Sequence, residues 1–185
     1  MFVVNRKPEE QLTLPRKRPV SKPKASRGPG HRPTSLDELD RQLLTHLQAD
    51  ARVSSAELAR RLGLSNPGVQ KRLRKLEERG VVQLYATVIN REAVGLDLLC
   101  FVHVMLAHHR PESVKRFPGR IKDMPEVLEC HFLTGEFDYL MKIVVADHER
   151  LQNFLFERLM KVDGVDRIRT SIVVKEVKAS TSLPL

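Results

Sequence analysis

The segment Val53–Gly80 constrains the fold of this 185-residue chain more than any other, because it encodes two short helices around a tight turn. Ser54 and Glu57 have the S-x-x-E spacing of a capping box, in which each side chain bonds the backbone N–H of the other residue. Gly63 ends the first helix, as glycine does where the backbone turns left-handed. Ser65 can cap the second helix. The segment therefore predicts a helix-turn-helix.

The second helix of this pair has one apolar side and one polar, mostly basic side. Val69, Leu73 and Leu76 are spaced i, i+4 and i+7, so they share the apolar side. The polar residues, with those at the helix start, form a predicted DNA-contact set: Ser65, Asn66, Gln70, Lys71, Arg72, Arg74 and Lys75. A helix fixed by its apolar side while presenting Lys and Arg outward suits the DNA major groove. The alternative for any such helix is a merely solvated charged face.

Position on the helix divides the expected DNA-contact roles. Gln70, Lys71 and Arg74 point outward and are best placed to read or grip the groove. Arg72 and Lys75 lie more to the sides, so we expect them to contact phosphates.

A third helix is expected upstream. Ser35 and Glu38 form a second S-x-x-E pair. The apolar residues that follow with helical spacing are Leu36, Leu39, Leu43, Leu44 and Leu47. Three small amphipathic helices can close a core that none could close alone. We therefore expect a tri-helical, possibly winged, helix-turn-helix domain over residues 35–80.

Net charge is distributed unevenly along the chain. Residues 1–34 hold nine Lys or Arg, two acidic residues and six of the eleven prolines, so their formal charge is +7. We expect this segment to be disordered. It could be a basic arm that binds phosphates, or equally a passive extension or a wrongly chosen upstream start. Residues 35–80 carry only +2 and residues 81–185 carry no net charge.

After Gly80 the pattern becomes that of strands. We expect a hinge strand at Val81–Asn90 within a linker 81–96, and then a domain over 97–178. Its expected strands are Leu98–Ala107, Val127–Leu133, Tyr139–Val145 and Arg167–Val177. One helix is marked by apolar residues from Val114 to Met124, with Pro118-Gly119 kinking it or delaying its start, and another runs from Asp147 to about Val162. The order βαββαβ is typical of a ferredoxin-like α+β domain, and residues 179–185 are expected to be a flexible end.

Both sides of the predicted strand 98–107 are largely apolar. Even-numbered residues from Leu98 to Leu106 form one side, and odd-numbered residues from Leu99 to Ala107 form the other. Two helices on one side of a sheet would leave the second side to be covered, most simply by a second copy of the sheet. The sequence therefore predicts a homodimer, which would also provide the two recognition helices that a two-fold DNA site requires.

With both halves considered, the chain resembles the Lrp/AsnC, or feast/famine, family of transcription regulators from about Leu36 to Lys178. Three segments carry the resemblance: LDELDRQLLTHLQADARVSSAELARRLGLSNPGVQKRLRKLEERGVV, EVLECHFLTGEFDYLMKIVV and GVDRIRTSIVVKEVK. It implies a sequence-specific regulator of double-stranded DNA, built from a helix-turn-helix and an amino-acid-binding domain. It also implies dimers that assemble into octamers or similar rings, and a small effector that shifts assembly or DNA affinity.

The effector is expected at the turn LTGEFDYL. Gly135 permits close backbone approach, and Asp138 could accept hydrogen bonds from an ammonium group. A plain strand-connecting turn explains the same residues from the pattern alone. In the family the G-x-x-D-Y region lines the effector pocket, and the residues that this implies here are Thr134, Gly135, Glu136, Asp138 and Tyr139.

Other functions have weaker support. The resemblance extends to siroheme decarboxylase subunits, for which His103 and His131 would be candidate pocket residues. A broad nucleoid-type DNA-binding protein acting through the basic tail is a further alternative. Cys100 with His103 and Cys130 with His131 fit a zinc site poorly. The two residues of each pair are three positions or one position apart on a strand, so they face opposite sides of the sheet. We expect no enzyme activity, cofactor, metal or membrane span, and a cytoplasmic location.

Overall fold

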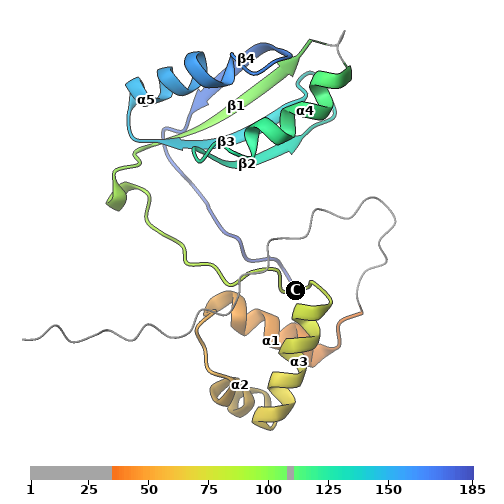
Figure 1. Ribbon diagram of the computed structural model, residues 1–185. Coiled ribbons are helices and arrows are strands. Elements are labelled where there is room, and N and C mark those ends of the chain that lie inside the picture. Colours follow the sequence, from red (N-terminus) through yellow and green to blue (C-terminus); the bar gives the residue numbers. More distant parts are fainter. Residues whose placement is uncertain (1–34, 108–110) are drawn as a thin grey trace, which may run out of the picture. The chain divides into compact units, whose positions relative to one another are not determined.

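The computed structural model describes residues 35–107 and 111–185, without the side chains of 111–115 (Figure 1). The chain forms two compact units. The first contains residues up to 87 together with 181–185, and the second contains residues 88–180. The predicted basic tail, residues 1–34, lies outside the described residues.

Three helices form the first unit: α1 (Glu38–Ala49), α2 (Ser55–Leu62) and α3 (Asn66–Glu78). Ser54 caps α2, because its hydroxyl accepts a hydrogen bond from the backbone N–H of Glu57 at 3.1 Å. Gly63 ends α2 in the left-handed conformation, with φ +64°. The Ser54 cap and the Gly63 end are confirmed, whereas the return bond of the predicted capping box is not formed, because the Glu57 carboxylate bonds Arg60 and Arg61 instead. The three helices bury a common core of Leu43, Leu44, Leu58, Ala59, Val69 and Leu76.

The start of α1 differs from the prediction. Asp37, not Ser35, is its N-cap, and the Asp37 carboxylate accepts a hydrogen bond from the backbone N–H of Asp40 at 2.7 Å. Aspartate caps a helix as well as serine does, so two capping residues competed within three positions. The carboxylate has a second partner in α3, described below, which favours the later start.

The predicted hinge strand Val81–Asn90 does not form within this chain. Residues 83–90 belong to no helix or sheet, and among the described residues no strand pairs with them. Val88 and Ile89 are 86% and 67% exposed, so their β-favouring side chains have no surface of this chain to pack on. A single 3₁₀ turn, η1 (Glu92–Val94), follows before the second unit.

The second unit contains β1 (Leu98–Leu106), α4 (Pro111–Ile121), β2 (Val127–Phe132), β3 (Tyr139–Val145), α5 (His148–Gln152), its π-helical continuation η2 (Asn153–Leu159) and β4 (Val165–Ile172). The four strands form one sheet in the order β2-β3-β1-β4, and every neighbouring pair is antiparallel. This order and the βαββαβ succession confirm the ferredoxin-like prediction.

Two details of this unit differ from the prediction. α4 begins at Pro111 and runs through Pro118, so the helix start is not delayed. The buried side chains of Phe117 and Ile121 hold its last turns against the sheet although Pro118 lacks an N–H. β4 ends at Ile172, opposite Cys100, instead of at Val177. The Val173 N–H still donates to the Leu99 carbonyl at 2.9 Å, but β1 begins at Leu98, so the residues approaching Val177 have no strand residue opposite them.

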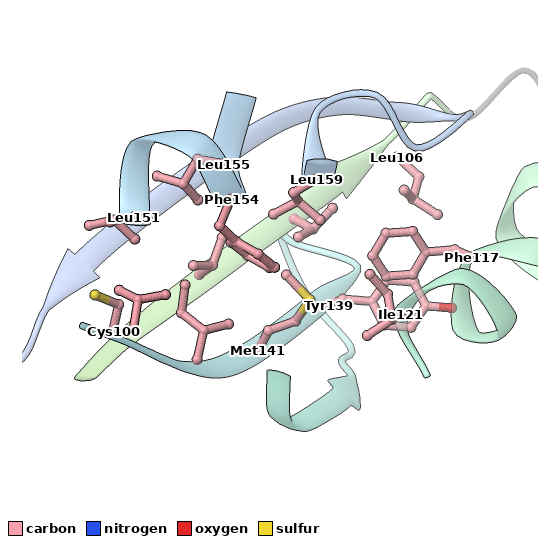
Figure 2. Close-up of a cluster of buried hydrophobic side chains, with 14 residues drawn as sticks. Cys100, Leu106, Phe117, Ile121, Tyr139, Met141, Leu151, Phe154, Leu155 and Leu159 are labelled. Atoms are coloured by element: carbon pink, nitrogen blue, oxygen red, sulfur yellow. The ribbon is translucent and has the colours of Figure 1, made fainter. Parts of the chain in front are cut away.

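The even-numbered side of β1 faces the helices. Figure 2 shows Leu151, Phe154, Leu155 and Leu159 of α5 and η2, with Phe117 and Ile121 of α4, around Cys100, Tyr139 and Met141 of the sheet. Both helical segments therefore pack on one side, as predicted. The other side, here called the open face, consists of Leu99, Phe101, His103 and Met105 of β1 with their cross-strand partners.

The last residues of the chain contact the first unit. The side-chain amide of Gln48 in α1 donates a hydrogen bond to the carbonyl of Leu183 at 3.1 Å, and its oxygen accepts from the Leu183 N–H at 2.5 Å. The end that the sequence predicts to be flexible thus has a backbone contact with the helical unit.

Candidate nucleic-acid interface and ligand loop

Two buried residues hold α3 in the tri-helical core. Val69 is 0% exposed and Leu76 is 1% exposed, and Leu73 packs against the same core. Four residues of the polar side are exposed: Gln70, Lys71, Arg74 and Lys75. The structure therefore brings these four predicted DNA-contact residues together on one accessible surface.

The start of α3 is built by Ser65. Its hydroxyl accepts a hydrogen bond from the backbone N–H of Gly68 at 3.2 Å, which makes it the N-cap. A Cβ at position 68 would lie 3.1 Å from that oxygen, so glycine allows the close approach. Ser65 at the N-cap and Asn66 and Pro67 in the first turn are exposed, at the end where the helix presents its backbone N–H groups.

The exposed residues of α3 border two hollows of the first unit. Gln70 and Arg74 line one of about 850 Å³, together with the α1–α2 connection and residues 82–85. Lys71 and Lys75 line another of about 620 Å³ beside the start of α1. The recognition surface thus has a mixed polar flank and a lysine-rich flank.

Arg72 lies deeper than the other predicted DNA contacts. Its Nη1 donates to Asp37 Oδ2 at 2.6 Å and to Asp40 Oδ1 at 2.8 Å. Asp40 is buried at 8% exposure, whereas the other core residues of this unit are apolar. The hydrogen bond from Arg72 is the largest of the effects that lower the pKa of Asp37 below its ordinary value.

A second charged group, not predicted from the sequence, lies on α2. Glu57 accepts hydrogen bonds from Arg60 at 2.7 and 2.9 Å and from Arg61 at 2.7 Å. These bonds lower the pKa of Glu57 to about 2. The i, i+3 and i, i+4 spacing of these residues is a signal that the sequence contains.

The predicted ligand loop joins β2 to β3. Thr134, Gly135 and Glu136 are exposed, and Gly135 has φ +129°, a conformation that side-chain-bearing residues rarely adopt. The loop therefore presents backbone and polar side chains outward at a position where glycine is required.

Asp138 is already bonded to the sheet. Its carboxylate accepts from the backbone N–H of Leu106 at 2.7 Å, its own N–H donates to the carbonyl of Val104 at 3.0 Å, and its carbonyl accepts from Leu133 at 2.8 Å. The carboxylate bond lies at Leu106, where the register of β1 with β4 shifts. Asp138 thus fixes the loop to the end of β1, and this bond occupies one of its carboxylate oxygens.

Tyr139 is separated from the other predicted ligand residues. Its ring is buried in the helix-covered core, 4.6 Å from the Phe117 ring and 5.1 Å from the Phe132 ring between centroids. Burial is the main cause that raises the pKa of its phenol. The ring supports the loop from below, while Thr134, Gly135 and Glu136 form its outer surface.

A histidine beside the loop was not among the predicted ligand residues. The His103 ring on the open face lies 4.8 Å from the Phe137 ring between centroids. Its Nδ1 is buried and has no hydrogen-bond partner among the described residues. An unmet polar atom of this kind is informative, but only the fold reveals it.

The open face is apolar along its middle and charged at its rims. Phe101 and Met105 are half-buried, with Lys142 opposite Phe101 on β3 and Arg167 opposite Met105 on β4. In the part of the chain that the structure describes, both helices pack on the other side. The face therefore lacks a covering helix, although Leu99 and its partner Val144 at one end of it are buried.

The cysteines lie away from the histidines that neighbour them in the sequence. Cys100 is in the helix-covered core, whereas His103 is on the open face. Cys130 lies opposite Met141, and His131 lies opposite Leu140 on the other side. Among residues 35–107 and 111–185, no three His, Cys, Asp or Glu side chains are grouped as metal ligands would be.

Family models match most of the chain. Residues 36–83 match a model described as winged helix-turn-helix DNA-binding, and residues 99–183 match the Lrp/AsnC ligand binding domain. Over the described residues, no helix has the length and apolar character needed to cross a membrane.

Named relatives and solved structures agree with these models. Leucine-responsive regulatory proteins of Salmonella typhimurium and Escherichia coli are 38% identical over 148 residues, which is 80% of this chain and 90% of each relative. A transcriptional regulator of Neisseria meningitidis, solved as an L-Met complex, is 35% identical with a TM-score of 0.78, covering 81% of this chain and 97% of that one. A leucine response regulatory protein of Mycobacterium tuberculosis is 40% identical with a TM-score of 0.68, covering 78% and 96%.

Proposed function

The chain belongs to the Lrp/AsnC family of DNA-binding transcriptional regulators, and from this premise we propose that α3 reads a specific DNA site under the control of an amino-acid effector. The relatives are named as regulators, which favours this function over the decarboxylase-subunit alternative. The observation that carries the proposal is the exposed row Gln70, Lys71, Arg74 and Lys75 on a helix whose opposite side is buried.

In the proposed complex, α3 enters the major groove. Gln70 and Arg74 contact base edges, and Lys71 and Lys75 on the other flank contact phosphates. Ser65 and Asn66 approach the backbone at the helix start, where phosphate oxygens are favoured. The N-cap bond of Ser65 fixes this end of the helix.

Binding-site selection tests the DNA proposal. The unaltered chain is expected to enrich a defined sequence from a random duplex pool. Arg74→Ala should weaken binding to that duplex by roughly 5- to 150-fold, which corresponds to the 1–3 kcal/mol of one good base contact. Lys175→Ala, an exposed cation of the second unit, is the matched control. Unchanged affinity in both Lys71→Ala and Arg74→Ala would remove α3 as the reading element.

For the effector we propose a zwitterionic amino acid at the 134–138 loop. Thr134, Gly135 and Glu136 are exposed, so their backbone N–H groups could bind a carboxylate, while Glu136 and the remaining acceptor capacity of Asp138 would bind an ammonium group. Tyr139 would support the loop without touching the ligand. The L-Met complex of the Neisseria meningitidis relative supports this ligand class.

Calorimetry with a panel of twenty amino acids tests the effector proposal. One or a few are expected to bind the unaltered chain and to change its affinity for the selected duplex. Glu136→Gln should weaken effector binding without changing DNA affinity in the absence of effector. If Glu136→Gln and Gly135→Ala both bound the amino acid as tightly as the unaltered chain does, the loop would be excluded as the effector site.

We further propose a homodimer that associates through the open face and assembles into larger rings. Support comes from Phe101 and Met105, which are half-buried on the side of the sheet without a covering helix. The nucleoid-type alternative differs in its response to truncation: a chain lacking residues 1–34 keeps its sequence preference under our proposal but loses most DNA affinity under the alternative.

A further inference from the structure

We propose that Arg72 is a positioning residue of the recognition helix, held by Asp37 and Asp40, rather than a contact to DNA phosphate. This inference rests on the proposed function and deepens it, because it separates the residues that touch DNA from those that set the angle of α3. The three residues are here called the Arg72 cluster.

The geometry of the Arg72 cluster links α3 to α1. Arg72 lies in the second turn of α3, Asp37 is the N-cap of α1, and Asp40 lies in the first turn of α1. One guanidinium nitrogen reaches both carboxylates at 2.6 and 2.8 Å. The Asp37 carboxylate also accepts the N–H of Asp40, so the cap of α1 and the ion pair share one group.

A buried charge makes this link specific. The side chain of Asp40 is 11% exposed and that of Arg72 is 29% exposed, whereas surface ion pairs of this chain such as Arg60–Glu57 are more open. A buried carboxylate left without its partner is strongly unfavourable, so α3 is favoured in the orientation that brings Arg72 to Asp40.

The charge of the cluster argues against a role in binding phosphate. One guanidinium shared between two carboxylates gives a formal charge of −1. By contrast, Lys71 and Lys75 on the same flank are exposed and carry no ion pair among the described residues. A DNA phosphate is therefore attracted to the two lysines and not to the Arg72 cluster.

A second arginine supports the same link one heptad later. Nη2 of Arg79 donates to the carbonyl of Ser35 at 3.1 Å. Arg72 and Arg79 are seven residues apart, so they lie on one side of the helix, and both reach the start of α1. The lysine-rich flank thus contains two arginines directed to the protein and two lysines available to DNA.

The test compares binding to the selected duplex with binding to a scrambled duplex of the same composition, each over a series of salt concentrations. Arg72→Gln should lower affinity for the selected duplex roughly tenfold or more relative to affinity for the scrambled duplex, and it should leave the salt slope unchanged. Lys71→Ala is the matched control, and it should reduce the slope on both duplexes by about 1 for each bound subunit.

The variants Asp37→Asn and Asp40→Asn change the affinity for the selected duplex in opposite directions, depending on whether Arg72 positions α3 or contacts phosphate. Electrostatics alone predicts that Asp37→Asn and Asp40→Asn bind all DNA more tightly, whereas loss of positioning weakens binding to the selected duplex only. Asp37→Asn keeps the helix cap, since asparagine caps as well as aspartate, and it serves if Arg72→Gln does not fold. Partial unfolding would lower both affinities by one factor, so their ratio reports positioning.

Each result decides between the roles. A reduced salt slope in Arg72→Gln with tighter binding by both aspartate variants would identify Arg72 as a phosphate contact and overturn the inference. An unchanged affinity ratio in every folded variant would also overturn it. Failure of the unaltered chain to enrich any sequence would instead refute the proposed function itself.

Discussion

At the scale of single residues, two glycines of the second unit have opposite requirements. Gly135 has φ +129° in the ligand loop, and a Cβ there would meet no atom within 4 Å. Gly119 has the same open surroundings but lies in α4 without a positive φ. Conformation, and not space, therefore distinguishes the two positions.

We expect Gly135→Ala to lower the free energy of unfolding by about 1–3 kcal/mol, because alanine is strained at this φ. Gly119→Ala is the control and should raise it by up to about 1 kcal/mol, because alanine favours the helix. Urea unfolding followed by circular dichroism measures both. Equal effects in the two variants would show that the loop relaxes to another conformation at no cost.

At the scale of elements, α2 contains an acid-sensitive ion-pair group. Bonds from Arg60 and Arg61 lower the pKa of Glu57 to about 2 from an ordinary value of 4.5. The folded protein therefore keeps Glu57 ionised where the unfolded chain would protonate it. The stability that Glu57 contributes is present above pH 4.5 and is lost as the pH falls from 4.5 towards 2.

Glu57→Gln should accordingly reduce the loss of stability between pH 5 and pH 2.5 relative to the unaltered chain. The remaining loss comes from groups such as Asp37 and Glu129, whose pKa values are also lowered. Urea unfolding at the two pH values measures the difference. Glu78→Gln on the exposed side of α3 is the control. If Glu78→Gln reduced the loss of stability between the two pH values as much as Glu57→Gln does, the assignment to Glu57 would be contradicted.

Elements defined by neighbouring residues were predictable from the sequence. The caps at Ser54 and Ser65 and the turn at Gly63 each depend on residues within three positions, and all three are confirmed. β3 was predicted with its observed bounds, Tyr139–Val145, because a buried apolar strand has a clear pattern.

Features that depend on distant partners were not predictable. Asp37 displaced Ser35 as the cap of α1 where Arg72, thirty-five residues later, also binds its carboxylate. Residues 83–90 have the composition of a strand but no strand of this chain beside them. In the ligand loop, the family resemblance implied both Asp138 and Tyr139 as pocket residues, whereas the sheet bonds the first and the core encloses the second.

At the scale of the whole molecule, the proposed dimer joins the ligand-binding domain to DNA recognition. A two-fold DNA site needs two copies of α3 at a fixed separation of about 34–36 Å, one turn of the duplex. The open face supplies an association surface within the second unit, so a change at that surface should alter how DNA is bound without touching α3.

Met105→Glu tests this coupling. In a single chain the new carboxylate lies opposite Arg167 on β4, so the fold should be retained. In a dimer through the open face it would be buried at the interface, where an added charge is costly. Sedimentation at micromolar concentration should show a dimer or larger species for the unaltered chain and a monomer for the variant.

The variant should also lose cooperative binding at the selected duplex and protect a single half-site in footprinting. Gln152→Glu places the same charge on the exposed side of α5 and is expected to keep the assembly and the full footprint. A stable monomer of the unaltered chain, or a Met105→Glu variant that sediments as the unaltered chain does, would exclude the open face as the dimer surface. Because α3 is unchanged, half-site affinity should persist in Met105→Glu, which separates loss of pairing from loss of DNA recognition.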